Sequence, residues 1–540
     1  MPAAKRTRQD LIAQDVQDLA RLGYAQQLYR EMGGFSNFAI SFSIISVLTG
    51  AVLLFGYGLK LAGPIVNSVG WPIVSLFTLC VAASMAELAS KYPTAGGLYF
   101  WAFQLGGRTW AWVTAWLNMI GQVTITAGIN VAAATYLIGA VTRIGGWPPD
   151  VAIPVFGSAT SWYFQLLVMA LIMVPQVLIN LFGIRLTARL NDFSVWWHIA
   201  GVVLIAGLLT FFGAYHNPPG FLFEHVTTTS PLDASSADFG GGRMAPALVI
   251  ADFKLPSPLF ALVPGLAALY AAVPFALAFV LGLLQAQWTY TGYDASAHVA
   301  EETVMARLNS AWGVFLSVAV SAVVGYLLLM VLTWCIPKGD VAATANDPYP
   351  VLQIAYANLS RFLANVVAVV IGGAMWLCGL ASITSMGRMW YAFARDDGMP
   401  GAWLLKRVDA RHGTPTWAIV VTSVLSILIT VYAAAFSVVT SISTITLYLA
   451  YVIPIYLNWR NRRRGAGEHT TPATAPWTLG RWSGAVNVIA IVWVVFITVV
   501  FALPPNELVL WTMVLVGVVL AVYWRVSARA RFVGPAASRT

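Results

Sequence analysis

A polar segment interrupts a long apolar run in the second half of the chain, and its residue types could do chemistry. It reads Gln287-Trp-Thr-Tyr-Thr-Gly-Tyr-Asp-Ala-Ser-Ala-His-Val-Ala-Glu-Glu302. The preceding residues 274–284 are almost wholly apolar, so we expect Tyr290–Asp294 to lie inside a membrane. Unpaired backbone groups are costly in hydrocarbon, so the break must face protein or water. A helix broken at mid-depth offers free carbonyl and N–H groups, which can hold a small charged solute.

A second interruption lies in the first long apolar run of the chain. There Ser46-Val-Leu-Thr-Gly50 places two hydroxyls and a glycine among residues that otherwise suit a membrane helix, and Gly292 marks the later interruption. Paired interruptions in corresponding segments of two halves indicate the binding site of a secondary transporter. Glycine is also common in membrane helices that only pack closely, and this alternative stays open.

The two breaks would bind different ends of a small zwitterion. The N–H groups of Gly50–Val52 would begin a half-helix and attract a carboxylate, with Gly50 letting the ligand approach bare backbone. The carbonyls of Trp288–Tyr290 would end a half-helix and accept hydrogen bonds from an ammonium group. Trp288, Tyr290 and Tyr293 would close over the solute or hold a quaternary amine by cation–π contact. The alternative is that these rings only pack.

A polar stripe is predicted on the third apolar run. Asn118, Gln122, Thr126 and Asn130 follow one another at intervals of four, so they share one helix face. In a membrane this face should point into the bundle, where it either lines the solute path or bonds to neighbouring helices. The residues expected to bind the solute are Ser46, Thr49, Gly50, Ala51, Val52, Gln122, Trp288, Thr289, Tyr290, Gly292 and Tyr293.

Two titratable side chains, His198 and Asp294, are expected well inside apolar runs. Histidine changes its charge near neutral pH, so His198 could carry a coupled proton. The alternative is an interfacial histidine in a Trp-rich segment that reaches toward lipid headgroups.

Acidic residues lead from the second break toward the expected cytoplasmic side. Asp294, Glu301 and Glu302 could pair with Arg388 or Arg395 and lock an inner gate. Glu87 could in the same way pair with a cytoplasmic arginine or lysine. The alternative is that these acids are solvated at the entry of a loop.

Composition identifies a polytopic membrane protein. Of 540 residues, 59% are hydrophobic and 9% are charged, whereas a soluble domain has roughly 25% charged residues. Cys80, Cys335 and Cys378 show no metal or redox spacing, and no disulfide is expected. The N-terminal segment has no short apolar core with a cleavage site, so we expect no cleaved signal peptide.

At about 20 residues per span, we expect an all-α protein with twelve transmembrane helices. They are predicted at 36–62, 71–90, 111–141, 162–183, 193–214, 271–297, 309–335, 362–392, 416–435, 437–459, 483–503 and 507–525.

The distribution of basic residues predicts that both termini are cytoplasmic. All but six of the 30 Lys and Arg residues then lie on cytoplasmic segments. The six outside are Lys60, Arg143, Arg243, Lys254, Lys338 and Arg361. The expected divisions are a cytoplasmic segment (1–35), a first five-helix half (36–214), an external loop (215–270), a second half (271–459), a basic cytoplasmic loop (460–482), two further helices (483–525) and a cytoplasmic tail (526–540).

Several longer strings resemble the amino acid, polyamine and organocation (APC) transporter superfamily, and within it the amino acid and choline branch that includes GABA permeases. The strings are Ser46-Val-Leu-Thr-Gly-Ala-Val52 with Leu54-Phe-Gly-Tyr-Gly58, Ala86-Glu-Leu-Ala-Ser-Lys-Tyr-Pro-Thr-Ala-Gly-Gly-Leu-Tyr-Phe-Trp101, Tyr290-Thr-Gly-Tyr-Asp294 with Glu301-Glu302, and Tyr391-Ala-Phe-Ala-Arg-Asp-Asp-Gly-Met-Pro400. The resemblance covers roughly residues 24–460. Asp397 departs from it by replacing the second glycine of the usual Ala-Arg-Asp-Gly-Gly loop.

The resemblance implies two inverted five-helix repeats with helices one and six broken, plus two peripheral helices, in the plasma (inner) membrane. It implies uptake of an amino acid or a related amine. Proton-coupled relatives place a lysine near the position of His198, facing span eight, so the resemblance implies Ser382, Thr384 and Ser385 as neighbours of His198.

Rival classes lack their sequence signals. Six scattered histidines form no enzyme or metal site, and no phosphate-binding loop supports ATP-driven pumping. The sequence has no repeated pore signature, which a channel would tend to show. Its basic residues form no single patch, which a nucleic-acid-binding protein would need. We therefore expect a secondary active transporter without a cofactor. The resemblance implies that it is coupled to protons and takes up an amino acid such as gamma-aminobutyrate. Choline, polyamines, amino acid exchange and a non-transporting substrate sensor remain the alternatives.

Overall fold

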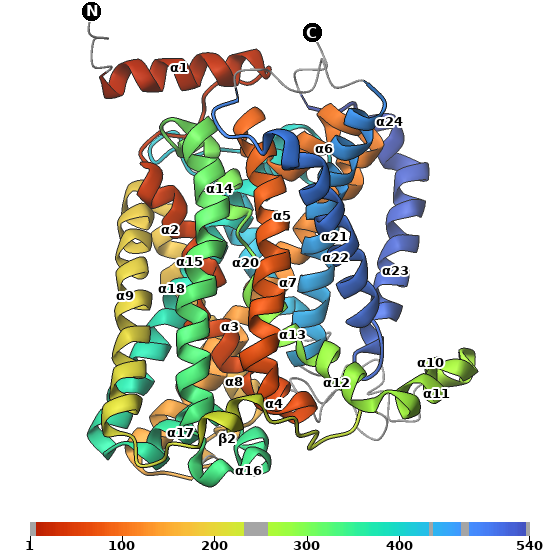
Figure 1. The fold of residues 1–540 in the computed structure, drawn as a ribbon. Coiled ribbons are helices and arrows are strands. Elements are labelled where there is room, and N and C mark those ends of the chain that lie inside the picture. Colours follow the sequence, from red (N-terminus) through yellow and green to blue (C-terminus); the bar gives the residue numbers. More distant parts are fainter. Residues whose placement is uncertain (1–6, 149, 232–257, 431–435, 466–474, 536–540) are drawn as a thin grey trace, which may run out of the picture.

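The protein is an almost wholly helical bundle (Figure 1). The structure is a computed structural model that describes residues 7–148, 150–231, 258–430, 436–465 and 475–535. Strands in this part of the chain are limited to the short pair β1 (Ala152–Ile153) and β2 (Gly157–Ser158). The helices up to the external segment are α1 (Arg8–Arg21), α2 (Gly34–Ile45), α3 (Val47–Leu53), α4 (Phe55–Ala62), α5 (Trp71–Lys91), α6 (Leu98–Gly106), α7 (Arg108–Gly145), α8 (Trp162–Leu181) and α9 (Ile184–Phe212).

The later helices follow the same pattern of long spans and short pieces. They are α10 (Pro258–Leu262), α11 (Pro264–Ala272), α12 (Pro274–Gly282), α13 (Leu284–Thr289), α14 (Ala295–His298), α15 (Ala306–Trp334), α16 (Val341–Asn346), α17 (Pro350–Asn358), α18 (Arg361–Arg395), α19 (Ala402–Leu405), α20 (Thr416–Ile429), α21 (Phe436–Arg463), α22 (Ser483–Val500), α23 (Glu507–Tyr523) and α24 (Arg529–Arg531). Single turns of 3-10 or π-helix join some of them, including η4 (Ala300–Glu302).

Ten helices in the described residues are long and apolar enough to cross a membrane, and a bent pair brings the number to eleven. The bent pair is the expected span six, in which Pro264–Ala272 meets Pro274–Thr289 at 96°. The expected span nine, 416–435, is represented by α20, which has only 14 residues and runs up to residues outside the described part. The expected loop 215–270 was wrong in part, because α10 and most of α11 lie within it.

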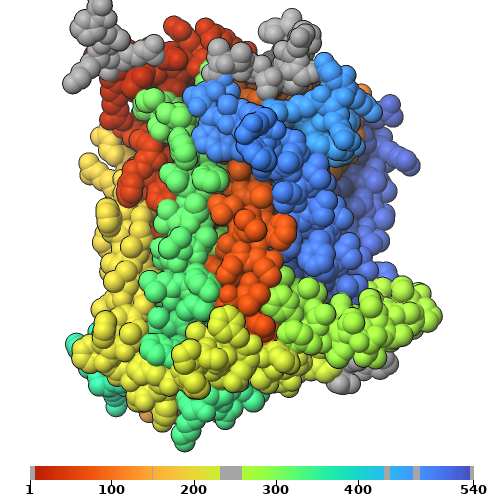
Figure 2. All heavy atoms as spheres, viewed as in Figure 1, coloured from red at the N-terminus to blue at the C-terminus, as the bar shows by residue number. Residues whose placement is uncertain are grey.

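Apolar side chains face one another at the centre of the bundle. There α7 packs against α21 and α18, while α15 packs against α5 and α2. From outside, α5 is visible between α15 and α22 (Figure 2). This packing surrounds the short pieces α2, α3, α13 and α14, so the two breaks lie inside protein rather than in lipid.

The bundle has two distinct ends. We call the end that carries α1 and α24 the α1 end; α4, α16 and α17 lie at the opposite end (Figure 1). Four of the six basic residues expected outside, Lys60, Arg143, Lys338 and Arg361, belong to elements at or beside the opposite end. Arg243 and Lys254 lie outside the described residues.

Candidate functional site

The first break lies at Ser46, four residues before the predicted position. Ser46 has φ 28° and ψ 84°, and it separates α2 from α3. Its carbonyl accepts the N–H groups of Thr49 and Gly50 at 2.8 and 3.0 Å. The expectation that Gly50–Val52 begin a half-helix was therefore wrong, because these residues lie within α3. Non-glycine residues with such strained backbone concentrate at functional sites.

The second break follows α13, which ends at Thr289 within the predicted segment. Gly292 has φ 89°, and α14 begins three residues later. Two of the three carbonyls predicted to be free already have partners. The carbonyl oxygen of Trp288 accepts from the N–H of Thr291 at 3.1 Å, and that of Tyr290 accepts from the hydroxyl of Tyr448 at 2.7 Å.

The two breaks interlock through their glycines. A Cβ added to Gly50 would lie 2.5 Å from Thr289 Oγ1, and one added to Gly292 would lie 2.2 Å from Ile44 Cγ2. Each glycine thus provides the space in which the other broken helix packs. Gly292 also needs its positive φ, which other L-residues rarely adopt.

A small cavity of about 180 Å³ lies between the breaks. Thr49, Gly50, Trp288 and Thr289 were predicted and do line it. The sequence interpretation missed the other lining residues, which are Ile44, Ile45, Ile125, Ile129 and Thr291. Among the described residues, the lining has no charged side chain and offers apolar walls, three hydroxyls and one indole.

The hydroxyls in the cavity are oriented by bonds within the protein. Thr289 donates to the carbonyl of Gln285 at 2.7 Å, and Thr291 donates to the carbonyl of Trp288 at 2.5 Å. Their hydrogens are therefore engaged, and their oxygen lone pairs can accept from a ligand. Such oxygens suit an ammonium group better than a carboxylate.

The predicted aromatic residues separate into two groups. Trp288 lines the cavity, and its indole N–H donates to Ser443 at 3.0 Å. Tyr290 does not line the cavity; its side chain is fully buried, with its hydroxyl 2.6 Å from Ser75 Oγ. Tyr293 packs its ring 5.0 Å from that of Tyr451. The packing alternative therefore holds for these two tyrosines.

The polar stripe on α7 faces the bundle, as predicted, and bonds to neighbouring helices. Asn118 Nδ2 and Gln122 Nε2 donate to Asp294 Oδ2 at 2.9 and 3.1 Å. Thr126 Oγ1 lies 2.6 Å from Ser382 Oγ. Gln122 therefore reaches the second break through Asp294, and it is not among the residues that line the cavity.

His198 is buried beside the first break. Its Nε2 lies 2.7 Å from Ser46 Oγ, and its Nδ1 lies 2.7 Å from the carbonyl oxygen of Ser194. Because a carbonyl only accepts, Nδ1 carries a hydrogen, and the hydroxyl of Ser46 can serve either protonation state of Nε2. A headgroup-facing histidine is excluded, since the side chain is 2% exposed.

The expected neighbours of His198 on span eight make other contacts. Ser382 pairs with Thr126, and Thr384 donates to Asn180 Oδ1 at 2.7 Å. Ser385 Oγ has no hydrogen-bond partner among the described residues. The implied contact between His198 and these hydroxyls was therefore wrong, because the ring turns toward Ser46.

Two of the three acids predicted to pair with Arg388 or Arg395, Glu301 and Glu302, form buried ion pairs with them at the α1 end. The same prediction for Asp294 was wrong, because its carboxylate is taken up by neutral donors and a histidine instead. Arg395 binds both oxygens of Glu301 at 2.9 Å, and Arg388 binds both oxygens of Glu302 at 2.9 and 3.1 Å. Burial opposes ionisation of Glu301, but Arg395, the N–H of Ala95 and Arg30 outweigh it and hold the pKa of this carboxyl below its usual range.

Glu87 also has the basic partner that was predicted for it. Arg462 Nη2 lies 2.9 Å from Glu87 Oε1, and the hydroxyl of Ser483 donates to Oε2 at 2.8 Å. This contact ties α5 to the ends of α21 and α22. A role of the three acids in gating stays a prediction.

The segment after α1, residues 22–33, forms an N-terminal strap across the same end. Arg30 Nη1 donates to the carbonyls of Ala300 and Thr303 at 3.0 and 2.5 Å. Met32 forms a parallel bridge with Thr303. The strap therefore covers the chain that leaves the second break.

Sequence reasoning missed His298 and Tyr451 as parts of the second break. His298 Nε2 lies 3.0 Å from Asp294 Oδ2, and the hydroxyl of Tyr451 donates to Asp294 Oδ1 at 2.8 Å. The spacing of four between Asp294 and His298 was a usable signal, because such residues are neighbours on a helix. Tyr451 lies on a distant helix, and no local pattern indicated it.

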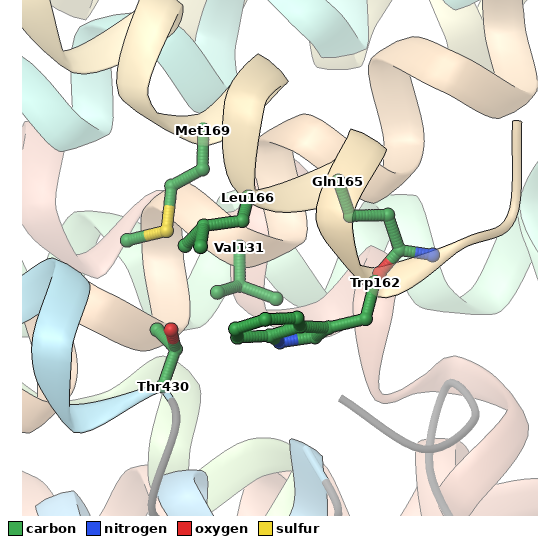
Figure 3. A pocket seen from close by; sticks show the side chains of 6 residues that line it. All are labelled: Val131, Trp162, Gln165, Leu166, Met169 and Thr430. Atoms are coloured by element: carbon green, nitrogen blue, oxygen red, sulfur yellow. The ribbon is translucent and has the colours of Figure 1, made fainter. Parts of the chain in front are cut away.

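A second cavity of about 230 Å³ lies away from the breaks (Figure 3). Its lining comes from α7, α8 and the residue after α20: Val131, Trp162, Gln165, Leu166, Met169 and Thr430. It shares none of these residues with the cavity between the breaks, and we assign it no role.

Comparison with known proteins gives one consistent family. Residues 32–524 match the family model described as amino acid permease. The chain is 32% identical to the amino-acid permease BAT1 of Arabidopsis thaliana, across 96% of this chain and 95% of that protein. It is 31% identical to the BAT1 homolog of Oryza sativa, across 96% and 94% of the two chains. It is 27% identical to the GABA-specific permease of Saccharomyces cerevisiae, across 77% of this chain and 66% of that protein.

Proposed function

Because the chain belongs to the amino acid permease family, a family of membrane transporters and not of enzymes, we propose that it takes up a small amino acid by alternating access, driven by a proton gradient. The observation that carries this proposal is the pair of interlocked breaks around one small cavity. Helices broken at mid-depth are the usual binding device of such transporters.

The chemistry of the cavity supports an amino acid over the alternative amines. Choline is usually held by several aromatic faces, whereas Trp288 is the single aromatic residue among the described residues of the lining. A polyamine would need acidic side chains, and the part of the lining that the structure describes has none. The oxygens of Thr289 and Thr291 suit one ammonium group, and the isoleucine walls suit a short methylene chain.

The apolar walls of the cavity support a short solute, because Ile44, Ile45, Ile125 and Ile129 leave little space between the two broken helices. Gamma-aminobutyrate has an ammonium group at the end of three methylenes and matches this shape. The similarity to a permease named as GABA-specific supports the same choice.

The proposed architecture has twelve spans, in two inverted five-helix repeats with two peripheral helices, in the plasma (inner) membrane. The bent pair α11–α12 and the short α20 would complete the ten full-length helices. The α1 end would be cytoplasmic. His198 would take part in proton coupling, because it bonds directly to the residue at the first break.

Binding by the purified protein tests the choice of substrate. Displacement of labelled gamma-aminobutyrate should be strong with short amino acids and weak with choline or spermidine. Replacing Thr289 by Val removes one oxygen while keeping the shape, and should weaken binding by about tenfold, or ~1.4 kcal/mol. Tighter binding of choline or spermidine than of any amino acid would overturn the choice.

A further inference from the structure

Asp294 and His298 form a buried acid–base pair in the second break, one helical turn apart. Both side chains are fully buried, and Nε2 of His298 lies 3.0 Å from Oδ2 of Asp294. The other ring nitrogen, Nδ1, lies 3.0 Å from the carbonyl oxygen of Ala95. Oxygen atoms therefore face both nitrogens of the imidazole.

These two contacts fix the number of protons. A carbonyl oxygen only accepts, so Nδ1 of His298 carries a hydrogen. A neutral imidazole would then present a lone pair on Nε2 to the lone pairs of an ionised Asp294, and they would repel at 3.0 Å. A further proton must lie between the two residues. The pair holds it either as imidazolium with carboxylate or as imidazole with carboxylic acid.

Neutral donors complete the hydrogen bonding of Asp294. Oδ2 accepts from Asn118 and Gln122 of α7 at 2.9 and 3.1 Å, and Oδ1 accepts from Tyr451 of α21 at 2.8 Å. None of these three side chains brings a positive charge. Only the proton shared with His298 therefore balances the charge of this carboxylate directly.

The remaining ionisable groups around the pair do not replace that proton. In the described residues they are the phenols Tyr293 and Tyr448, the ion pairs Glu301–Arg395 and Glu302–Arg388, and Arg30, whose charge is offset by Asp15. Without its proton, the pair would carry one buried negative charge, which costs several kcal/mol. Release of the proton must therefore accompany a rearrangement that admits water.

The pair is connected to the closed α1 end through the turn of residues 92–97, between α5 and α6. The carbonyl of Ala95 accepts from His298, and its N–H donates to Glu301 Oε1 at 3.0 Å. A Cβ added to Gly97 would lie 3.3 Å from ring atoms of His298, so the turn packs directly against the imidazole. Glu301 is itself held by Arg395.

We propose that Asp294 and His298 together bind a coupled proton, at a site separate from that of His198, and that this proton holds the turn of residues 92–97 against the second break. The part of this inference that links the proton to transport rests on the proposed function. Loss of the proton weakens the contact between His298 and Ala95, and the turn then separates from the broken helix and opens the α1 end.

The proton-dependent contact between His298 and the turn of residues 92–97 is called the proton latch below. Hydrogen exchange of the turn tests this latch without any transport. In the purified wild type, the amides of residues 94–97 should exchange faster at mildly alkaline than at mildly acidic pH, after correction for intrinsic rates. Asp294→Asn can donate to Nε2 and imitates the protonated pair, so the turn should stay protected at both pH values. His298→Gln should leave it unprotected at both, while His412→Gln, at a partly exposed histidine, should behave as wild type. Equal protection in all four proteins would overturn the latch.

Transport by the same variants tests the coupling. In proteoliposomes with an inward proton gradient, Asp294→Asn and His298→Gln should lose accumulation but retain exchange of labelled for unlabelled solute. Wild-type accumulation by either variant would overturn the coupling role. Protection of α7 in the exchange experiment shows whether each variant has folded. If the wild type transports nothing yet shows the latch, the proposed function fails and the proton site stands.

Discussion

Gly50 and Gly292 matter at the residue scale because each gives space to the opposite broken helix. Thr289 occupies the space beside Gly50, and Ile44 occupies the space beside Gly292. A side chain at either position would push the half-helices apart. The cavity lies between these same residues.

Replacing Gly50 or Gly292 by Leu should therefore abolish measurable solute binding. Even one extra methyl group in a packed site costs roughly 1–3 kcal/mol, and Leu adds four carbon atoms. Gly207→Leu is the matched control, because a Cβ at Gly207 meets nothing within 4 Å. Binding is measured with labelled amino acid on purified protein. Normal affinity in both variants would show that the breaks do not form the site.

His198 offers a second test at this scale. His198→Ala removes the ring that bonds to Ser46, so we expect loss of proton-driven accumulation with solute exchange retained. Both are measured in proteoliposomes with labelled substrate. Unchanged accumulation would leave His198 with a purely structural role.

Local pattern predicted some of these residues and missed others for physical reasons. Polar residues inside apolar runs indicated both breaks, Asp294 and the stripe on α7. The first break was placed at Gly50 because glycine tolerates irregular backbone. The protein instead uses Ser46, which the contacts with His198 and Thr49 hold in place. The contact with Thr49 is local, but the contact with His198 is tertiary, and the sequence contains no local sign of it.

At the scale of elements, the α1 end is closed by ion pairs between separate helices. Glu301 follows the second break in the chain and forms an ion pair with Arg395 at the end of α18. The N-terminal strap lies over the same segment, because Arg30 donates to the carbonyl of Ala300. The sequence predicted the ion pairs of Glu301 and Glu302 with Arg395 and Arg388, because both kinds of charge lie at or near the expected cytoplasmic ends of their spans. The strap was not predicted, because residues 22–33 carry only a general polar pattern.

Glu301→Gln should destabilise the protein by ~3 kcal/mol, because it leaves Arg395 as a buried charge without its partner. The pKa of Glu301 is lowered in the fold, so its contribution is fully present above the unfolded value of about 4.3 and is lost only as pH falls through the folded value. The loss in thermal stability should therefore be the same at mildly acidic and mildly alkaline pH.

Asp397→Asn is the control for this experiment. The pair of Asp397 and Lys406 is 41% exposed on both sides, and an exposed pair contributes roughly 0–1 kcal/mol. Asn also tolerates the positive φ of 56° at this position. A Glu301→Gln protein as stable as this control would show that the buried pair does not hold the α1 end closed.

At the scale of the whole molecule, the two ends differ in charge as the sequence predicted. The described basic residues expected outside lie on elements at or beside the end opposite α1, and most other Lys and Arg residues lie toward the α1 end. Hydropathy predicted the ten long apolar helices and the apolar run that forms the bent pair, whereas it did not predict the 96° bend before α12. Its cause is the Val273–Pro274 step, at which the residue before proline leaves the helical region.

Thiol labelling in cells tests the orientation. Lys338→Cys and Arg464→Cys place exposed thiols at opposite ends, and Cys80→Ser removes the partly exposed native thiol. A membrane-impermeant maleimide should label position 338 in intact cells and position 464 only after permeabilisation. The reverse pattern would place the α1 end outside.

Proton-driven uptake is the central claim, and purified protein in proteoliposomes tests it most directly. The measurement is accumulation of labelled gamma-aminobutyrate, other amino acids, choline and spermidine, each with and without an inward proton gradient. We predict that gamma-aminobutyrate or another short amino acid accumulates above its external concentration only when the gradient is present. Absence of uptake of every compound, with or without the gradient, would contradict the account.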